Sequence, residues 1–379
     1  MFHISTRSES SHEDIRGLKY PAETGPHIAT ILGFPSIHSL PSFYHSVACG
    51  EIIGLAVAVS HFEPVRLYTR PEEVSLAQSL LSNTTRGSYD IEIIPFATNH
   101  LWVRDTGPVY VQGTTTTSKK QRVAIHFGFN EWGRKGVAEG WPRMTADQIQ
   151  ENHTFAKHVT ESDSDSSSLI SITSKVCLEG GALVSDGDGT LIVSESSIIG
   201  DKRNPGVSKD EIEDELRWIL GVKKIIWFAG FQDLDITDVH ADAEVQFIRP
   251  GVIVVSRPHA SAQKEWHEVY QQVMNVLRGE IDARGRQFEI HTIDEPDPEL
   301  ILTSGLGYKE DPATNYVNFY YVNGGVILPK FGDEEMDRRA LETMQKLHPD
   351  RIVKQVHVNA LPLTGGVIHC ATQPVIDVR

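Results

Sequence analysis

The chain has 379 residues, of which 40% are hydrophobic and 23% charged, the balance of an ordinary globular protein. Its formal net charge of −16, and the lack of any Lys- or Arg-rich run in the sequence, argue against a nucleic-acid partner. A negative field of this kind favours a cationic substrate instead.

The cysteine content and the N-terminal sequence indicate the compartment. The only cysteines are Cys49, Cys177 and Cys370, which are too few for a disulfide framework and leave one unpaired. This usage is typical of a reducing compartment. Residues 1–7 lack the apolar core of a signal peptide, and no run approaches the length of a membrane span. We therefore expect a soluble, cytoplasmic protein with no membrane partner; a homo-oligomer is neither indicated nor excluded.

The first part of the chain alternates strands and helices after a polar beginning. Residues 1–18 are expected to form a flexible N-terminal segment, and residues 19–379 a single domain. We predict a strand over 29–32, a helix over 44–60, a strand over 64–68 and a helix over 71–81, which begins with a tolerated proline. Two polar low-complexity stretches, 113–120 and 161–168, are predicted to be surface loops.

A unit of strand, glycine turn, strand, helix and strand recurs three times after residue 176. In the first copy, Ser208 and Glu211 form a capping box, and Gly221 ends the helix. Such repeats suggest a ring or propeller of small mixed sheets, in which clusters near the first strand of each unit converge on the axis. The predicted elements are 177–184, 191–193, 208–221 and 224–228; 240–248, 251–256, 263–278 and 288–290; and 317–321, 326–328, 334–347 and 353–356.

Two acidic residues lie beside glycines. Asp105 precedes Gly107-Pro108, where the ordinary role of an aspartate is to hydrogen-bond a turn. Glu179 lies between an apolar strand and a double glycine, and it is unlikely to be buried unless it is paired. A surface turn is the simpler interpretation of each motif taken alone.

A third cluster spans residues 235–245. On a strand, Asp238, His240, Asp242 and Glu244 would all point to one face. Neighbouring carboxylates repel, so this face requires a cation, a cationic ligand or an arginine between them. A divalent metal is the competing interpretation, but no zinc motif supports it, and we rank it below an organic cation.

Near the end of the sequence, two glycines and a short apolar run precede Cys370, which predicts a turn and a strand that deliver a thiol. A lone cysteine is usually structural. Together with the three acidic clusters, however, one chemistry fits. Carboxylates match the fork of a guanidinium, a thiolate can attack its central carbon, and a histidine can transfer the protons.

With these motifs the chain resembles the agmatine deiminase family, within the pentein-fold guanidine-modifying enzymes, over nearly all of its length from Tyr20. The resemblance rests on Pro21-Ala22-Glu23 with His27, Trp102 to Pro108, Phe129-Asn130 with Trp132-Gly133, Leu178 to Gly181, Arg203-Asn204-Pro205, Thr237 to Asp242, Tyr316 to Tyr320 with Asn323-Gly324, Phe331-Gly332-Asp333, and Ile368-His369-Cys370 with Thr372-Gln373.

The resemblance implies a five-fold pseudo-symmetric α/β propeller, forming a single catalytic domain with a central site and needing no cofactor or metal. It implies Cys370 as the nucleophile, His240 as the general acid/base and Glu179 as the residue that orients it. Asp105 and Asp242 would hold the guanidinium of a small substrate, with Asp238 as a further substrate-binding candidate. Water would then release a ureido product, which is N-carbamoylputrescine if the substrate is agmatine.

Three further side chains receive structural interpretations. Alternation along a strand would turn His369 away from Cys370, and Cys49 is expected in the core. Cys177 faces the same way as Glu179, but core packing is favoured. Family members usually carry other residues at five positions that border the pocket or the motifs, namely Thr24, Ile31, Phe34, Val239 and Gln246.

Other functions stay open at this stage. A deiminase of peptidyl-arginine or free arginine would use the same residues, and an amidinotransferase would need an acceptor amine. A binding protein for cationic metabolites would need none of the catalytic groups, so the joint presence of Cys370, His240, Glu179, Asp105 and Asp242 argues against it.

Overall fold

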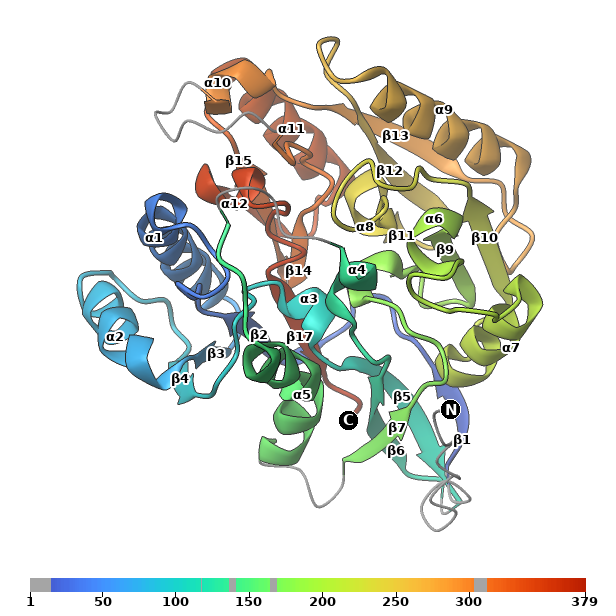
Figure 1. Ribbon diagram of the computed structural model, residues 1–379. Helices are drawn as coiled ribbons and strands as arrows, with labels where there is room; N and C mark the ends of the chain where they lie inside the picture. Colours follow the sequence, from blue (N-terminus) through green and yellow to red (C-terminus); the bar gives the residue numbers. More distant parts are fainter. Residues whose placement is uncertain (1–14, 117, 136–140, 164–168, 303–311) are drawn as a thin grey trace.

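Five small sheets organise the protein. The computed structural model describes residues 15–116, 118–135, 141–163, 169–302 and 312–379. Within these ranges the strands form three sheets of three strands and two sheets of four. The result is a mixed α/β fold, in which the longer helices lie around the outside of Figure 1 and α3 and β17 lie near its middle.

The three predicted repeat units are confirmed as the three-stranded sheets. In each sheet an antiparallel pair of strands is followed by a helix, and then by a third strand that runs parallel to the second strand of the pair. The capping box and the left-handed Gly221 at the two ends of α7 are also confirmed. The elements are β8 (Val184–Ser185), β9 (Thr190–Ser194), α6 (Glu195–Ile198), α7 (Lys209–Leu220) and β10 (Lys224–Phe228); β11 (Val245–Arg249), β12 (Val252–Arg257), α9 (Lys264–Gly279) and β13 (Glu289–Asp294); β14 (Tyr320–Val322), β15 (Gly325–Lys330), α11 (Glu334–Leu347) and β16 (Ile352–His357).

The two four-stranded sheets contain the same order of elements. In one of them the last strand, β17, pairs antiparallel with β2, so distant parts of the chain share a sheet. The elements are β1 (Ile15–Lys19), β5 (Val109–Thr115), β6 (Lys120–His126), α5 (Ala146–Ser162) and β7 (Ile170–Thr173); and β17 (Thr372–Ile376), β2 (His27–Gly33), α1 (Ser42–Val59), β3 (Val65–Thr69), α2 (Val74–Ser82) and β4 (Ile91–Pro95), with the short 3-10 helix η1 (Pro71–Glu73) before α2.

Part of the predicted N-terminal segment is ordered. Residues 15–18 belong to β1, which pairs antiparallel with β5, so the expected boundary at residue 18 is wrong for these four residues. Residues 1–14 lie outside the described residues. The polar stretch 113–120 is the tip of the β5–β6 hairpin, and most of the stretch 161–168 lies outside the described residues.

The expectation that no segment reaches membrane-span length is also wrong. Helix α1 has 18 residues with a mean hydropathy of 1.4, which by length and composition alone is enough to cross a membrane. However, 56% of it is buried inside the protein, where it packs against β2, β3, α2 and α12 (Ala360–Leu363). The hydropathy of α1 is therefore that of a core helix.

Short helical turns, rather than strands, occupy the inner ends of the units. The predicted strands at 177–184, 240–248 and 317–321 all begin later than expected. At the second of these, Asp235 accepts hydrogen bonds from the backbone N–H groups of Thr237 and Val239, and this local turn competes with strand formation. These short helices are α3 (Val103–Thr106), α4 (Glu131–Arg134), η2 (Gly180–Ala182) and α8 (Ala241–Glu244); α10 (Pro298–Leu302) is also short but lies at the periphery, after β13 (Figure 1).

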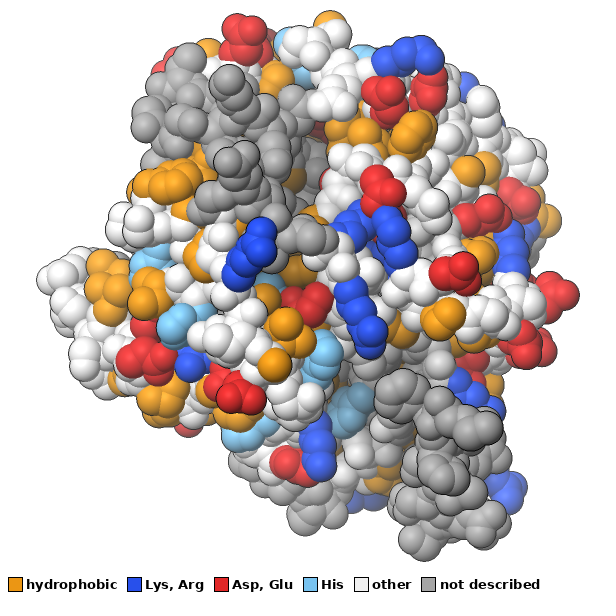
Figure 2. Space-filling view, viewed as in Figure 1, with side chains coloured by type: hydrophobic (Ala, Val, Ile, Leu, Met, Phe, Trp, Pro, Cys, Tyr) orange, Lys and Arg blue, Asp and Glu red, His pale blue; other side chains and the backbone are white. Residues whose placement is uncertain are grey.

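Acidic and basic side chains are interspersed over the face shown in Figure 2. The overall negative charge of the chain is therefore not gathered in one surface patch of that face. The convergence of charge described next lies among buried side chains.

Candidate active site

The thiol of Cys370 lies in a turn that precedes β17, and not on a strand as the sequence predicted. Asn318 fixes this turn from the neighbouring unit. Its side-chain carbonyl accepts a hydrogen bond from the backbone N–H of Cys370 at 3.2 Å, and its amide donates to Sγ at 3.3 Å. The nucleophile candidate is thus positioned by backbone and side-chain contacts from outside its own segment.

The other candidates converge on Gly181 in η2. A Cβ atom added to this glycine would lie 2.6 Å from Nδ1 of His240, 3.0 Å from Oδ1 of Asp105 and 3.1 Å from Oδ2 of Asp242. Oδ2 of Asp242 is in turn 3.8 Å from Sγ of Cys370. Four residues from three separate segments therefore surround one small space, which only glycine leaves open.

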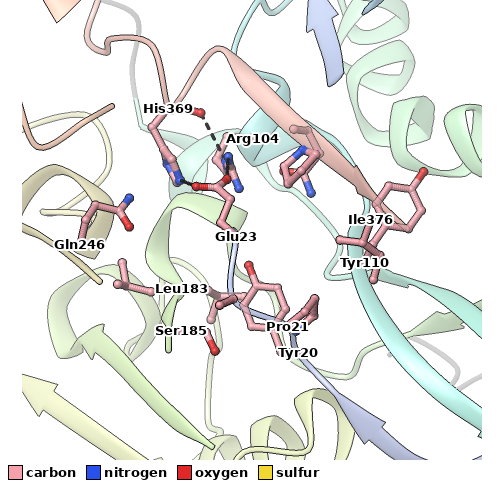
Figure 3. Close-up of a pocket in the computed structure, with 14 residues that line it drawn as sticks. Tyr20, Pro21, Glu23, Arg104, Tyr110, Leu183, Ser185, Gln246, His369 and Ile376 are labelled. Carbon is pink, nitrogen blue, oxygen red and sulfur yellow. Dashed lines mark hydrogen bonds and ion pairs between the residues drawn. The ribbon is translucent and has the colours of Figure 1, made fainter. Parts of the chain in front are cut away.

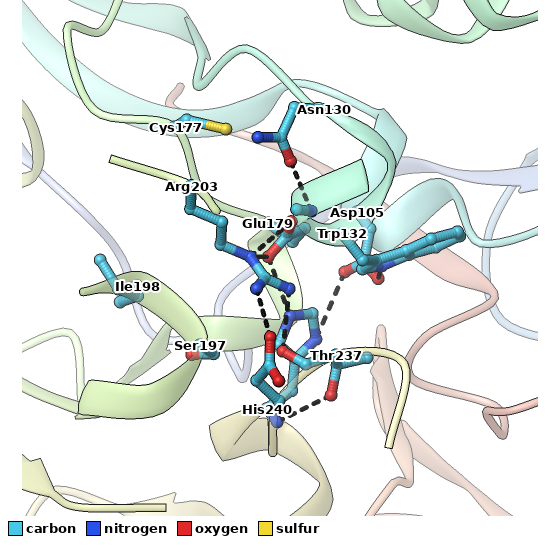
Figure 4. A network of polar contacts seen from close by, with 12 residues as sticks. Asp105, Asn130, Trp132, Cys177, Glu179, Ser197, Ile198, Arg203, Thr237 and His240 are labelled. Carbon is cyan, nitrogen blue, oxygen red and sulfur yellow. Dashed lines mark hydrogen bonds and ion pairs between the residues drawn. The ribbon is translucent and has the colours of Figure 1, made fainter. Parts of the chain in front are cut away.

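Asp105 lies on α3, and two donors hold its carboxylate. The indole N–H of Trp132 donates to Oδ2 at 2.8 Å, and the backbone N–H of Gly181 donates to Oδ1 at 3.2 Å. The turn that carries Trp132 has positive φ values at Glu131, Trp132 and Arg134 (59°, 49° and 57°). This uncommon backbone conformation directs the indole to Asp105, as Figure 4 shows.

His240 is held from the opposite side by Glu179 and Arg203 (Figure 4). Its Nε2 lies 3.1 Å from Oε2 of Glu179, whose two oxygens both accept from Nε of Arg203. Burial lowers the pKa of His240, but the charges of Asp105 and Glu179 outweigh it and raise the value to about 9. His240 is therefore an imidazolium at neutral pH, and its buried Nδ1 has no hydrogen-bond partner among the described residues.

Asp242, on α8, offers one free oxygen to the site. Its Oδ2 accepts from Nδ1 of His369 at 2.7 Å, whereas Oδ1 is buried without a hydrogen-bond partner among the described residues. Leaving a buried carboxylate oxygen unpaired is costly, so a cationic ligand at this point would recover a lost interaction.

Cys370 is a neutral thiol in this environment. Burial, together with the carboxylates of Asp242 and Asp105, raises the pKa of the Cys370 thiol well above its ordinary value. The same two carboxylates would attract a guanidinium. A bound cation would offset their field and favour the thiolate.

The strand-face interpretation of residues 238–244 is wrong. Asp238 and Val239 have φ values of 62° and 68°, and residues 241–244 form the helical turn α8. Asp238 does not join the cluster around Gly181. Its Oδ1 accepts from Nζ of Lys135 at 2.6 Å, and its Oδ2 accepts from Nη1 of Arg203 at 2.7 Å. With both oxygens bound to protein cations, Asp238 supports the site from behind Glu179.

Three contributors were not recognised as site residues from the sequence. Asn318, Trp132 and Arg203 occur within the motifs that carry the resemblance, but no periodicity or charge pattern marks them. His369 was expected to point away; instead its ring reaches Asp242 because the segment is a turn and not a strand.

The two remaining cysteines lie elsewhere. Cys49 is buried in α1 beside His45, in agreement with the prediction. Cys177 is half-buried and donates to the carbonyl of Gly128 at 3.0 Å. In Figure 4 it lies on the far side of Arg203 from His240.

Among the described residues, no group of three or more His, Cys, Asp and Glu side chains is arranged to hold a metal ion. Arg203 is the cation that separates Glu179 from Asp238.

The chain is similar to known proteins over nearly its whole length. Residues 19–375 match the model of the family described as Porphyromonas-type peptidyl-arginine deiminase. The protein named "Putative agmatine deiminase 1" of Listeria monocytogenes is 31% identical over 386 residues, covering 98% of this chain and 99% of that protein. A relative of similar name in Streptomyces coelicolor is 32% identical, covering 94% of this chain and 98% of that protein. The solved agmatine deiminase of Enterococcus faecalis has a TM-score of 0.80 at 26% identity, covering 94% of this chain and 95% of that chain.

Proposed function

Because the chain belongs to the Porphyromonas-type peptidyl-arginine deiminase family, we propose that it is a hydrolase that removes ammonia from the guanidinium group of agmatine, leaving N-carbamoylputrescine. The observation that carries this proposal is the convergence of His240, Asp105 and Asp242 on Gly181, beside the thiol of Cys370. Its relatives named agmatine deiminase support the choice of substrate.

Asp105 and Asp242 bind the guanidinium. A guanidinium carries five N–H donors in a fixed plane and pairs with carboxylates through two parallel hydrogen bonds. Oδ2 of Asp242 and Oδ1 of Asp105 both face the space at Gly181, and Oδ1 of Asp242 is a further buried acceptor without a partner among the described residues. With its nitrogens held at the edges, the guanidinium exposes its central carbon to Sγ of Cys370.

The first half of the reaction releases ammonia. Binding of the cation favours loss of the thiol proton to the solvent, and the thiolate forms a bond to the guanidinium carbon. His240, which is protonated before the reaction, donates a proton to the departing nitrogen. The carbon–nitrogen bond breaks, NH₃ leaves, and an amidino group remains on the sulfur of Cys370.

The second half uses the neutral His240 as a base. It takes a proton from a water molecule, whose oxygen bonds to the same carbon. The carbon–sulfur bond then breaks and the hydroxyl proton passes to the sulfur, which restores the Cys370 thiol and releases the ureido product. Glu179 keeps the imidazole oriented through both halves by its contact with Nε2.

The pairing of the cations around the site favours agmatine over arginine. Free arginine carries an α-carboxylate, for which a site usually provides an Arg or Lys. Three arginine and lysine side chains near the cluster are already paired: Arg104 with Glu23, Arg203 with Glu179 and Asp238, and Lys135 with Asp238. None of these three is left for a substrate carboxylate.

The proposal extends to the architecture and to the compartment. We propose that the five sheets are the units of a five-fold pseudo-symmetric α/β propeller, which forms one catalytic domain that includes β1. The position of the candidate residues at the inner ends of the units supports this arrangement. We also propose a reducing, cytoplasmic environment, since all three cysteines are free thiols and the reaction needs one of them reduced.

The test is ammonia release on separate incubation with agmatine, free arginine and an arginine-containing peptide. Agmatine alone should be turned over, and Cys370→Ala should abolish the activity. Cys49→Ala is the matched control, because it removes a thiol that is buried in α1 beside His45 and should leave turnover intact. Turnover that persists in Cys370→Ala would refute the mechanism. Preference for another guanidine would refute the substrate, and a product formed only with an added acceptor amine would identify an amidinotransferase.

A further inference from the structure

His369 connects the cluster to a second set of charges. Its Nδ1 lies 2.7 Å from Oδ2 of Asp242, and its Nε2 lies 3.1 Å from Oε2 of Glu23. An ionised carboxylate only accepts hydrogen bonds, so both ring nitrogens must donate. The geometry therefore requires an imidazolium. In agreement, burial and Arg104 lower the pKa of His369, but Glu23 and Asp242 outweigh them and raise it.

Glu23 is in turn fixed by Arg104, whose Nη2 donates to Oε1 at 2.5 Å and whose Nε donates to the carbonyl of His369 at 3.2 Å. Burial alone would raise the pKa of Glu23, but Arg104 and His369 lower it to about 2. His27 also anchors the segment, because its Nε2 lies 3.0 Å from the carbonyl oxygen of Glu23. Glu23 is therefore a fixed negative charge.

The four side chains form a row of alternating charge, in which Glu23 is half-buried and the others are buried: Asp242, His369, Glu23 and Arg104. Figure 3 shows the last three beside a cavity of about 40 Å³, which is room for a few water molecules. Gln246 and Gln373 also line the cavity, each with one buried polar atom that lacks a partner among the described residues. Tyr20 faces the same charges, but burial raises its pKa to about 12, so it stays neutral.

We propose that His369 and Glu23 are positioning residues for the deimination. His369 binds Oδ2 of Asp242, the oxygen that faces Gly181 and Cys370, and so fixes the carboxylate in the orientation that receives the guanidinium. Glu23 keeps His369 doubly protonated. This inference rests on the proposed function, because it assigns Asp242 to the substrate. It assigns a role to two residues that touch neither the substrate nor Cys370 Sγ.

The alternative is a staple that only joins distant segments, since Glu23 and His369 are 346 positions apart. Substitution would then reduce stability and leave catalysis of the folded protein unchanged. The two roles therefore differ in the kinetics of the folded protein. The protonation state of His369, which can be observed in the resting enzyme without any turnover, tests the charge arrangement on which the positioning role depends.

The first experiment measures the ¹⁵N chemical shifts of the histidine rings in the full-length enzyme, assigned with His369→Asn. We expect both nitrogens of His369 to be protonated at pH 7 to 8, and one of them to lose its proton in Glu23→Gln. A neutral His369 in the unsubstituted enzyme would overturn the proposal even if agmatine turnover is normal. Absence of agmatine turnover alongside a doubly protonated His369 would instead fault the proposed function.

The second experiment compares kinetics. Glu23→Gln keeps the shape of the side chain but removes its charge, and we expect kcat/KM for agmatine to fall about 100-fold with a raised KM, as for a misplaced binding group. His348→Asn is the control: like His369, His348 is buried, and both of its ring nitrogens are hydrogen-bonded, one to Tyr321 and the other to the carbonyl of Met344. It should lower the melting temperature and spare kcat and KM. Unchanged kinetics in Glu23→Gln would refute a positioning role.

Discussion

Replacing Gly181 with alanine tests whether the reaction takes place where the side chains converge. The added Cβ would lie 2.6 Å from Nδ1 of His240, about 0.8 Å short of the 3.4 Å at which ordinary contact begins. The backbone at Gly181 does not have a left-handed φ, so the effect of the alanine would come from this clash and not from backbone strain.

The clash cannot be relieved cheaply. Glu179 holds the imidazole of His240, and the hydroxyl of Thr237 holds its backbone N–H at 3.0 Å. A displacement near 1 Å in a reacting group costs about 100-fold in rate, whereas one extra methyl group in a packed interior costs about 1–3 kcal/mol of stability. We therefore expect kcat/KM for agmatine to fall about 100-fold in a protein that still folds.

The assay is steady-state ammonia release, combined with urea unfolding and near-UV circular dichroism to confirm the fold. Gly54→Ala is the control: it lies in α1 with nothing within 4 Å of its added Cβ, and it should gain up to about 1 kcal/mol of stability without a change in rate. Full activity in a folded Gly181→Ala protein would show that the guanidinium does not occupy this space, and the proposed site would be wrong.

Two further predictions follow from the charges. The pKa of His240 is raised from 6.5 to about 9, so the contribution of its protonated form to stability is complete below pH 6.5 and is lost as the pH rises through about 9. We expect kcat to fall over the same upper pH range, because the acid loses its proton there. Glu179→Gln should move this fall in kcat to lower pH. A pH profile in which kcat keeps rising above pH 9 would contradict the role of His240 as the acid. Asp238→Asn should reduce the free energy of unfolding by about 3–5 kcal/mol, because the positive charges of Lys135 and Arg203 then lose the carboxylate that they share. It should change KM for agmatine little. Asp242→Asn is its comparison and should raise KM strongly; equal effects on KM would mean that Asp238 also contacts the substrate.

Elements with local signals could be predicted from the sequence. Helix α11 (residues 334–347) and strand β10 (residues 224–228) match their predicted bounds, and α7 begins and ends at the predicted cap residues. In each case the capping residues, the apolar spacing or the glycine turns are sufficient to predict the bounds of the element, because these signals depend only on residues close in the sequence.

The inner ends of the units could not be predicted in this way. Asp235 diverts residues 237–239 into a turn through side-chain hydrogen bonds, which alternation of polar and apolar residues does not reveal. As a result the faces assigned to Asp238 and His369 were wrong, although Asp105, His240, Asp242 and Cys370 do lie together. Partners such as Asn318 and Trp132 contact the site across 52 and 27 positions of the sequence, and no local pattern encodes such contacts.

The pairing of β17 with β2 has a consequence for the synthesis of the protein. Thr372 lies opposite Leu32, and Val375 lies opposite Ala29, so this sheet closes across almost the whole sequence. Contacts of such long separation form late in folding, because the entropy of closing a large loop must be overcome first. The turn that carries Cys370 enters its place together with β17. During synthesis the chain therefore contains Asp105, His240 and Asp242 well before Cys370. The ribosome must add residues 372–376 before the enzyme can turn over its first substrate.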